Sequence, residues 1–156
     1  MSANQPVDTE AVLAVLRERR LPRRAAKVLD GVHTPFDLID VVLKGLPKQT
    51  LTAVVRAATP NAREALALRR RILPDVTWKR RTVRLSPDES DRTMRLACLV
   101  ALARHVWHGD SAGAVEYLSV PRAELQGRAP LDCIRTDLGC RLVEDCLLLI
   151  LYGIGV

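Results

Sequence analysis

The residues of this sequence whose types suit chemistry are a few histidines and cysteines and many arginines, and only the arginines are grouped. The histidines and cysteines are His33, His105, His108, Cys98, Cys133, Cys140 and Cys146. No two cysteines show C-x-x-C spacing, and no histidine pair has the spacing of metal ligands. The sequence has neither a nucleophile elbow nor a glycine-rich phosphate loop. We therefore expect buried thiols that pack as small hydrophobic groups, no metal or other cofactor, and no enzymatic activity.

Arginine and lysine are concentrated in residues 63–81. The pattern predicts two helices around a tight turn, the second of them short and rich in cations. This is the layout of a helix-turn-helix, whose second helix enters the major groove while basic side chains contact phosphates. A solvated basic face is the alternative interpretation. Trp78 is predicted to anchor the helices rather than to contact bases. The candidate DNA contacts are Arg69, Arg70, Arg71, Thr77, Lys79, Arg80, Arg81 and Arg84.

The C-terminal end of the sequence is unusually apolar. Residues 146–152 form an apolar run that continues into Gly153-Ile154-Gly155-Val156. A helix that is apolar around its whole circumference needs burial, either in the protein's own core or, in part, in a partner. Glu144 and Asp145 are neighbours on this helix and point about 100° apart by helix geometry, so we interpret them as surface or interface charges.

The charge of the chain is distributed unevenly. Residues 1–84 hold 17 Lys and Arg against 8 Asp and Glu, a formal charge of +9, whereas residues 85–156 hold 7 against 10, or −3. This predicts two parts with different partners, 1–84 and 85–156. The first residues lack a basic and apolar leader, and the longest apolar run is far shorter than the about 20 residues that cross a bilayer. A cytoplasmic protein with no membrane contact is expected.

Helix starts are marked by hydroxyl residues followed by proline, at Thr34-Pro35, Thr59-Pro60 and Ser86-Pro87. Glu89 completes a capping box with Ser86. The helix that follows is apolar nearly all round, so it should be central and buried. No segment alternates as a strand does, and the fold class is predicted to be all-α. The expected helices are 8–20, 35–44, 47–58, 60–72, 75–81, 87–107, 110–118 and 137–152, with short turns at Pro121 and Pro130.

The order and spacing of several motifs resemble the Xre/MbcA/ParS-like antitoxin family over essentially the whole second half. These motifs are LSPDESDR at 85–92, GD at 109–110, YL at 117–118, LQGRAPL at 125–131, TDLG at 136–139, VED at 143–145 and YG at 152–153. In the first half, GLP at 45–47 and VTWKRR at 76–81 look like the family's Xre-type helix-turn-helix.

The resemblance implies a helix-turn-helix bundle at 1–84 followed by a helical toxin-binding domain at 85–156, in the antitoxin of a type II toxin–antitoxin system. The partner would be a RES-domain toxin that consumes NAD or transfers its ADP-ribose. In such families the antitoxin's C-terminal end covers the toxin's active-site cleft, which agrees with the apolar C-terminal end of this sequence. The expected toxin contacts are Arg141, Glu144, Asp145, Leu148, Tyr152, Gly153, Ile154, Gly155 and Val156.

Two further partners are expected. A helix-turn-helix protein commonly reads two half-sites, which predicts a homodimer on operator DNA. The toxin implied by the resemblance adds a toxin–antitoxin hetero-oligomer. The alternative function is a free-standing helix-turn-helix regulator without a toxin. The neighbouring gene distinguishes the two, because only an antitoxin requires a toxin gene beside it.

Overall fold

The computed structural model describes residues 8–153, which form helices joined by loops and turns, with no strand among them. This confirms the predicted all-α class. Apart from one 3₁₀ turn, Ala123–Leu125, the elements are α-helices, and none of those described is long and apolar enough to cross a membrane. Their bounds are α1 (Thr9–Leu16), α2 (Arg23–Asp30), α3 (Pro35–Lys44), α4 (Lys48–Ala58), α5 (Ala62–Ile72), α6 (Asp75–Arg80), α7 (Pro87–Val106), α8 (Ser111–Ser119), α9 (Pro130–Cys133) and α10 (Asp137–Leu151).

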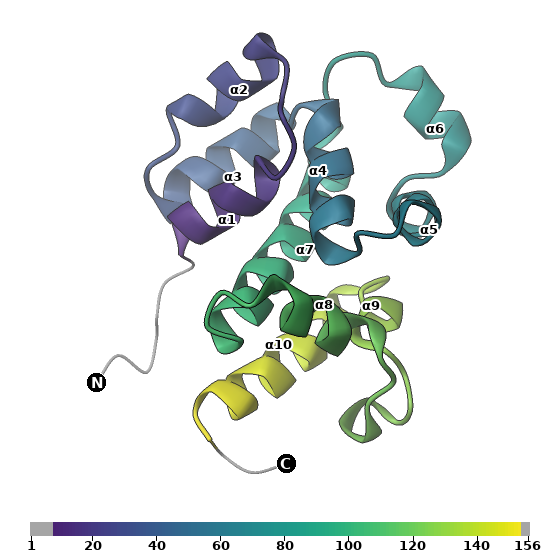
Figure 1. The fold of residues 1–156 in the computed structure, drawn as a ribbon. Helices are drawn as coiled ribbons and strands as arrows, with labels where there is room; N and C mark the ends of the chain where they lie inside the picture. Colours follow the sequence, from purple (N-terminus) through teal and green to yellow (C-terminus); the bar gives the residue numbers. More distant parts are fainter. Residues whose placement is uncertain (1–7, 154–156) are drawn as a thin grey trace.

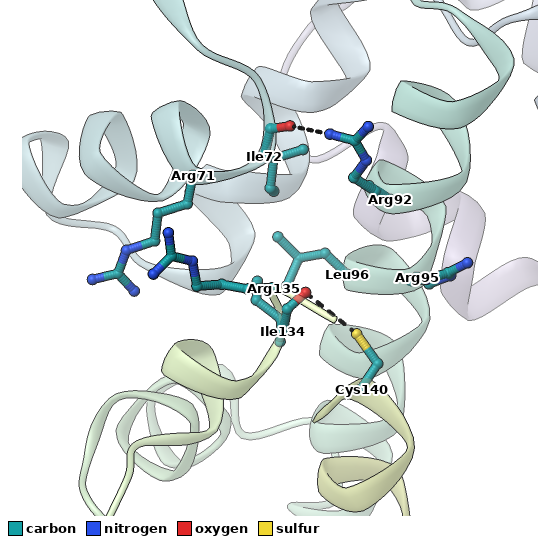
Figure 2. A pocket seen from close by; sticks show the side chains of 8 residues that line it. All are labelled: Arg71, Ile72, Arg92, Arg95, Leu96, Ile134, Arg135 and Cys140. Carbon is teal, nitrogen blue, oxygen red and sulfur yellow. Dashed lines mark hydrogen bonds between the residues drawn. The ribbon is translucent and has the colours of Figure 1, made fainter. Parts of the chain in front are cut away.

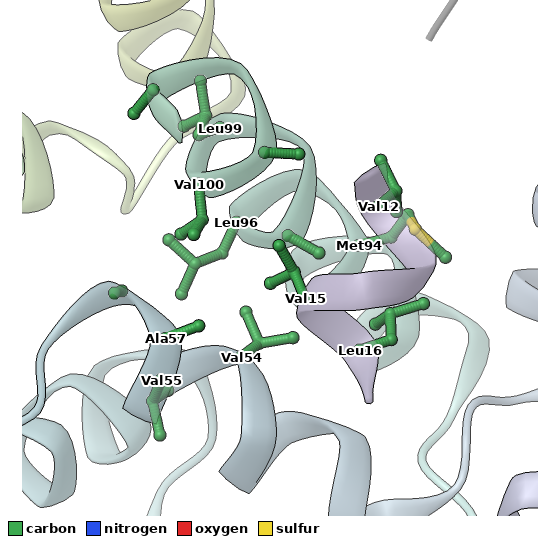
Figure 3. Packing of buried hydrophobic residues seen from close by; sticks show 14 of the residues in the cluster. Val12, Val15, Leu16, Val54, Val55, Ala57, Met94, Leu96, Leu99 and Val100 are labelled. Carbon is green, nitrogen blue, oxygen red and sulfur yellow. The ribbon is translucent and has the colours of Figure 1, made fainter. Parts of the chain in front are cut away.

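α7 is the axis of the molecule, as its apolar circumference predicts. It packs against α1, α3, α4 and α5 from the first part of the chain and against α8 and α10 from the second (Figure 1). Met94, Leu96 and Val100 of α7 lie in one buried cluster with Val15 of α1 and Val54 of α4 (Figure 3). Helices on all sides of α7 therefore depend on this one helix for their core.

The packing is continuous across the point where the charge changes sign. The Leu85 backbone N–H donates to the Leu46 carbonyl at 2.9 Å, and the Leu46 N–H donates to the Ser90 hydroxyl at 2.8 Å. Gly45 has a φ of +90° and lies so close that a Cβ there would collide with the Leu85 carbonyl oxygen. Parts 1–84 and 85–156 thus differ in charge but share one core.

Two of the three predicted helix starts are capped as expected, and the third is not. Ser86 and Glu89 form the predicted capping box, and Thr34 caps α3 in the same way. Thr59 was expected to cap α5 but ends α4, and its hydroxyl donates to Glu64 at 2.9 Å. Asn61 caps α5 instead, since it stands nearer the first turn and its side-chain oxygen accepts two backbone N–H groups there.

The expected helix over 8–20 is wrong in its second half, and α2 was missed. α1 ends at Leu16, and residues 17–20 are exposed. Arg17 and Glu18 lie in this segment and pair with Asp30 and Arg104 at 3.2 and 2.8 Å. α2 begins after Pro22, with no side-chain cap. Only Ala25 and Leu29 are buried, so α2 has no cap and only a short apolar stripe to mark it in the sequence.

Candidate functional site

The last helix has two apolar faces, and the core covers only one of them. Cys140, Val143 and Leu147 are buried, and α10 packs along α7 through this face. The opposite face follows the spacing i, i+4, i+7, i+11 and i+14, which places its members in one line along the helix. These residues, called the outer stripe below, are Leu138, Leu142, Asp145, Leu149 and Tyr152.

The outer stripe is open to solvent. Its side chains are 68 % exposed at Leu138, 48 % at Leu142, 38 % at Leu149 and 53 % at Tyr152. Asp145, at its centre, is exposed and forms no ion pair within residues 8–153. A line of large, exposed apolar side chains is a typical interaction surface.

Local contacts fix where α10 begins and ends. Thr136 caps the helix by accepting the Gly139 N–H at 3.0 Å. Gly139 approaches the Cys133 carbonyl so closely that a Cβ there would collide with it, so only glycine allows this packing of α10 on the α9 segment. At the other end Gly153 has a φ of +65° and donates its N–H to Ile150 at 3.1 Å, which ends the helix in a left-handed cap.

The predicted contacts in the C-terminal end lie mostly on the exposed side of α10. Asp145 and Tyr152 belong to the outer stripe, and Arg141 lies beside it, paired with Asp137 at 2.7 Å. Leu148 is half-buried, Glu144 is exposed on the flank, and Gly153 is exposed. The predicted contacts Ile154, Gly155 and Val156 lie outside the described residues. Sequence reasoning missed Leu138, Leu142 and Leu149. The signal that could have found them is their spacing of three or four residues in one line with Asp145 and Tyr152.

The basic segment forms two helices around a turn at Leu73 and Pro74, as expected. Arg69, however, is only 6 % exposed. Its guanidinium donates to the Leu73 carbonyl at 2.8 Å and also bonds Asp75. Hydrogen bonds from Arg69 and then Arg70 lower the pKa of Asp75. Arg69 therefore holds the turn together.

Most of the other predicted DNA contacts are also engaged within the protein. Arg70 bonds Asp75, Arg71 bonds Asp132, Arg81 forms a double contact with Glu89, and Arg84 donates to the Gly45 carbonyl. Thr77 is half-buried. Lys79 and Arg80 are exposed and make no ion pair or side-chain hydrogen bond within the described part of the chain. These two cations are therefore the ones most available to an anionic partner.

Trp78 has the anchoring position that the sequence predicts. Its ring is half-buried against the hydrophobic core. Lys48 Nζ lies 4.2 Å from the ring centroid and the Arg69 guanidinium carbon 5.1 Å from it. Both cations are close enough for a cation–π interaction. Trp78 thus holds α6 against α4 and α5, while the polar residues that follow it, Lys79 and Arg80, stay exposed to solvent.

Comparison with known proteins bears differently on the outer stripe and on the basic segment. A family model described as the antitoxin Xre/MbcA/ParS C-terminal toxin-binding domain matches residues 102–153. A curated relative, antitoxin Xre of Pseudomonas putida KT2440, is 37 % identical over 166 aligned positions that cover the whole of both chains. The chain belongs to the Xre/MbcA/ParS antitoxin family. The outer stripe lies within the segment that matches the toxin-binding domain, and the basic segment precedes it.

The thiols of this antitoxin are poorly suited to chemistry. Burial raises the pKa of Cys98 to about 11, and burial also raises the pKa of the other three thiols above the ordinary value. Since the thiolate is the reactive form, these cysteines act as packing groups. Tyr117 packs its ring 4.8 Å from that of Trp107, and burial raises its pKa to about 12. In the described part of the antitoxin, no group of three His, Cys, Asp or Glu side chains is placed to hold a metal ion.

Proposed function

We propose that this antitoxin neutralises a RES-domain toxin that consumes NAD or transfers its ADP-ribose, by covering the toxin's active-site cleft with α10 and the tail after it. The observation that carries the proposal is the outer stripe, an unpartnered apolar surface inside the segment matched by the toxin-binding domain. The type of toxin follows from the motif resemblance at 85–153. Arg141, Glu144, Leu148 and the tail 153–156 complete the proposed contact.

Asp145 sets a condition on the toxin surface. Any partner that covers the outer stripe removes water from the Asp145 carboxylate, which no cation of residues 8–153 neutralises. A buried and unpaired charge is strongly destabilising. The groove on the toxin is therefore expected to be apolar with one Arg or Lys opposite Asp145. A cleft that binds an anionic dinucleotide offers such cations.

The test is co-expression with the product of the neighbouring gene, following growth, intracellular NAD and co-purification. Leu142→Asp places a charge in the outer stripe and should abolish co-purification and rescue. Leu66→Asp is the matched control, since Leu66 is 44 % exposed but lies on α5. Absence of binding and rescue by the unaltered antitoxin would leave the free-standing regulator as the better account.

We also propose that the antitoxin binds operator DNA through α6, with Lys79 and Arg80 contacting phosphates. Their exposure and lack of intramolecular partners support this. Because each phosphate contact releases counterions, binding should weaken as salt is raised. The Lys79→Ala and Arg80→Ala double variant should reduce the slope of log affinity against log salt by about 2. An unchanged slope would remove these residues from the DNA surface.

The proposed homodimer has a candidate surface on α3. Phe36, Ile39 and Leu43 are 77, 55 and 64 % exposed and follow the spacing i, i+3 and i+7. α3 carries Asp37 near its start and Lys44 at its end. Antiparallel pairing with a second copy would bring acid and base together. Phe36→Ser should lower the mass measured by light scattering to that of one chain, and an unchanged dimer mass would exclude this surface.

A further inference from the structure

A cavity of about 120 Å³ lies between α5, α7 and the segment that joins α9 to α10 (Figure 2). A cavity needs about 10–15 Å³ of such free space to hold one water molecule, so this one has room for a tetrahedral group of four oxygen atoms. The family match gives no role to this place, and Arg71 alone among its residues was a predicted DNA contact. The lining residues are Arg71, Ile72, Arg92, Arg95, Leu96, Ile134, Arg135 and Cys140.

The positive charge around this cavity is only partly neutralised. Arg71 pairs with Asp132 at 2.8 Å, and Arg95 pairs with Asp91 and Asp137. Arg92 has no carboxylate and donates to the Ile72 carbonyl at 3.0 Å. Arg135 makes no hydrogen bond or ion pair through its side chain within residues 8–153. The guanidiniums of Arg92 and Arg135 thus leave about two charges without a counter-charge.

Arg71, Arg92 and Arg135 line the cavity from three different elements, over an apolar floor. Figure 2 shows the Arg71 and Arg135 side chains extending to one side, while Arg92 reaches toward the end of α5. The Arg95 guanidinium is turned away from the cavity in the same view. The remaining lining side chains, mainly apolar, form the floor between them and are Ile72, Leu96, Ile134 and Cys140.

We propose that this arginine pocket binds the phosphate group of a phosphate monoester. Guanidinium donors match phosphate oxygens, and donors that arrive from three elements suit a tetrahedral dianion better than a planar carboxylate. A phosphate monoester carries nearly two negative charges at neutral pH, equal to the unneutralised charge of Arg92 and Arg135. The apolar floor gives the ester's organic part a surface to lie on, which a free hydrated ion does not need.

The experiment compares the thermal unfolding midpoint of the full chain in inorganic phosphate, in adenosine 5′-monophosphate and in sodium chloride of matched ionic strength. At a ligand concentration about ten times the Kd, linkage should raise the midpoint by roughly 3–5 °C for a chain of this size. Arg135→Ala should remove the shift without changing the fold, because that side chain has no intramolecular partner. Arg23→Ala is the control, an exposed arginine on α2 far from the pocket in the fold.

Each outcome decides the proposal. A shift with both phosphate compounds, larger for the nucleotide and lost in Arg135→Ala, supports a monoester site. The absence of a shift with either phosphate compound, or a shift with inorganic phosphate alone, overturns the proposal. The same holds for a shift that sodium chloride reproduces or that Arg135→Ala retains. Duplex DNA is included as a third probe, and a shift lost in Arg135→Ala that appears with DNA alone would assign these arginines to the DNA surface instead.

Discussion

The two faces of α10 can be separated by mutation, because one holds the fold together and the other is free. Leu147 is fully buried, so Leu147→Ala should lower the free energy of unfolding by about 3–5 kcal/mol through lost transfer energy and a cavity. Leu138 and Leu142 are 68 and 48 % exposed. Replacing both by Ala should therefore change the unfolding free energy by only about 1 kcal/mol.

Toxin binding should respond in the opposite order. Complete burial of a Leu side chain contributes about 1.5–3 kcal/mol, and the exposed parts of Leu138 and Leu142 together equal roughly one side chain. The Leu138→Ala and Leu142→Ala double variant should thus bind the toxin roughly 10–100-fold more weakly. Urea unfolding and calorimetric titration with the purified product of the neighbouring gene measure the two quantities. If this variant unfolds as easily as Leu147→Ala, or binds as tightly as the unaltered protein, the assignment of faces is wrong.

Three more predictions concern the fold. Burial raises the pKa of Glu89, but hydrogen bonds from Arg81 and Ser86 outweigh it and lower the pKa overall. The stability from Glu89 is present above its unfolded pKa of about 4.3 and lost as pH falls through the lower folded value, so Glu89→Gln should reduce acid sensitivity in urea unfolding below about pH 5. Gly45→Ala should cost over 1 kcal/mol in the same assay, since Ala needs φ below zero and would strike Leu85. His108 has a φ of +53°, a left-handed backbone conformation that is strained for residues with a Cβ. His108→Gly should therefore raise the thermal midpoint by about 2 °C, and a lower midpoint would show that the conformation is not strained.

Features that depend only on residues close together in the sequence were predictable. The helix start at Thr34 and the capping box at Ser86 need only residues one to three positions apart, and the apolar circumference of 87–107 already places that helix at the centre. α2 was missed because Pro22 provides no side-chain cap and α2 buries little beyond Ala25 and Leu29. The burial of Leu29 in the core and the pairing of Asp30 with Arg17 are tertiary contacts, which no local pattern records.

The functional surfaces were hard to predict from the sequence for the same reason, because they depend on tertiary contacts. Residues 146–152 are all apolar, so the sequence does not say which of them face α7, and the outer stripe became visible only once Val143 and Leu147 were placed in the core. Arg69 and Lys79 look alike in a basic segment. The contact of Arg69 with Asp75 and its burial beneath Trp78 depend on how the turn folds back, a tertiary effect that charge counting misses.

The sharing of α7 has a consequence for how such chains can diversify. A helix that contacts α1, α3, α4 and α5 as well as α8 and α10 carries the matching surface for both parts of the chain. Recombination between related genes at residue 84 would join an N-terminal part to an α7 shaped for a different one, with Gly45 against an altered Leu85 segment. Exchange of partners in this lineage is therefore expected to proceed by substitutions on the exposed face of α10, which no other helix has to match.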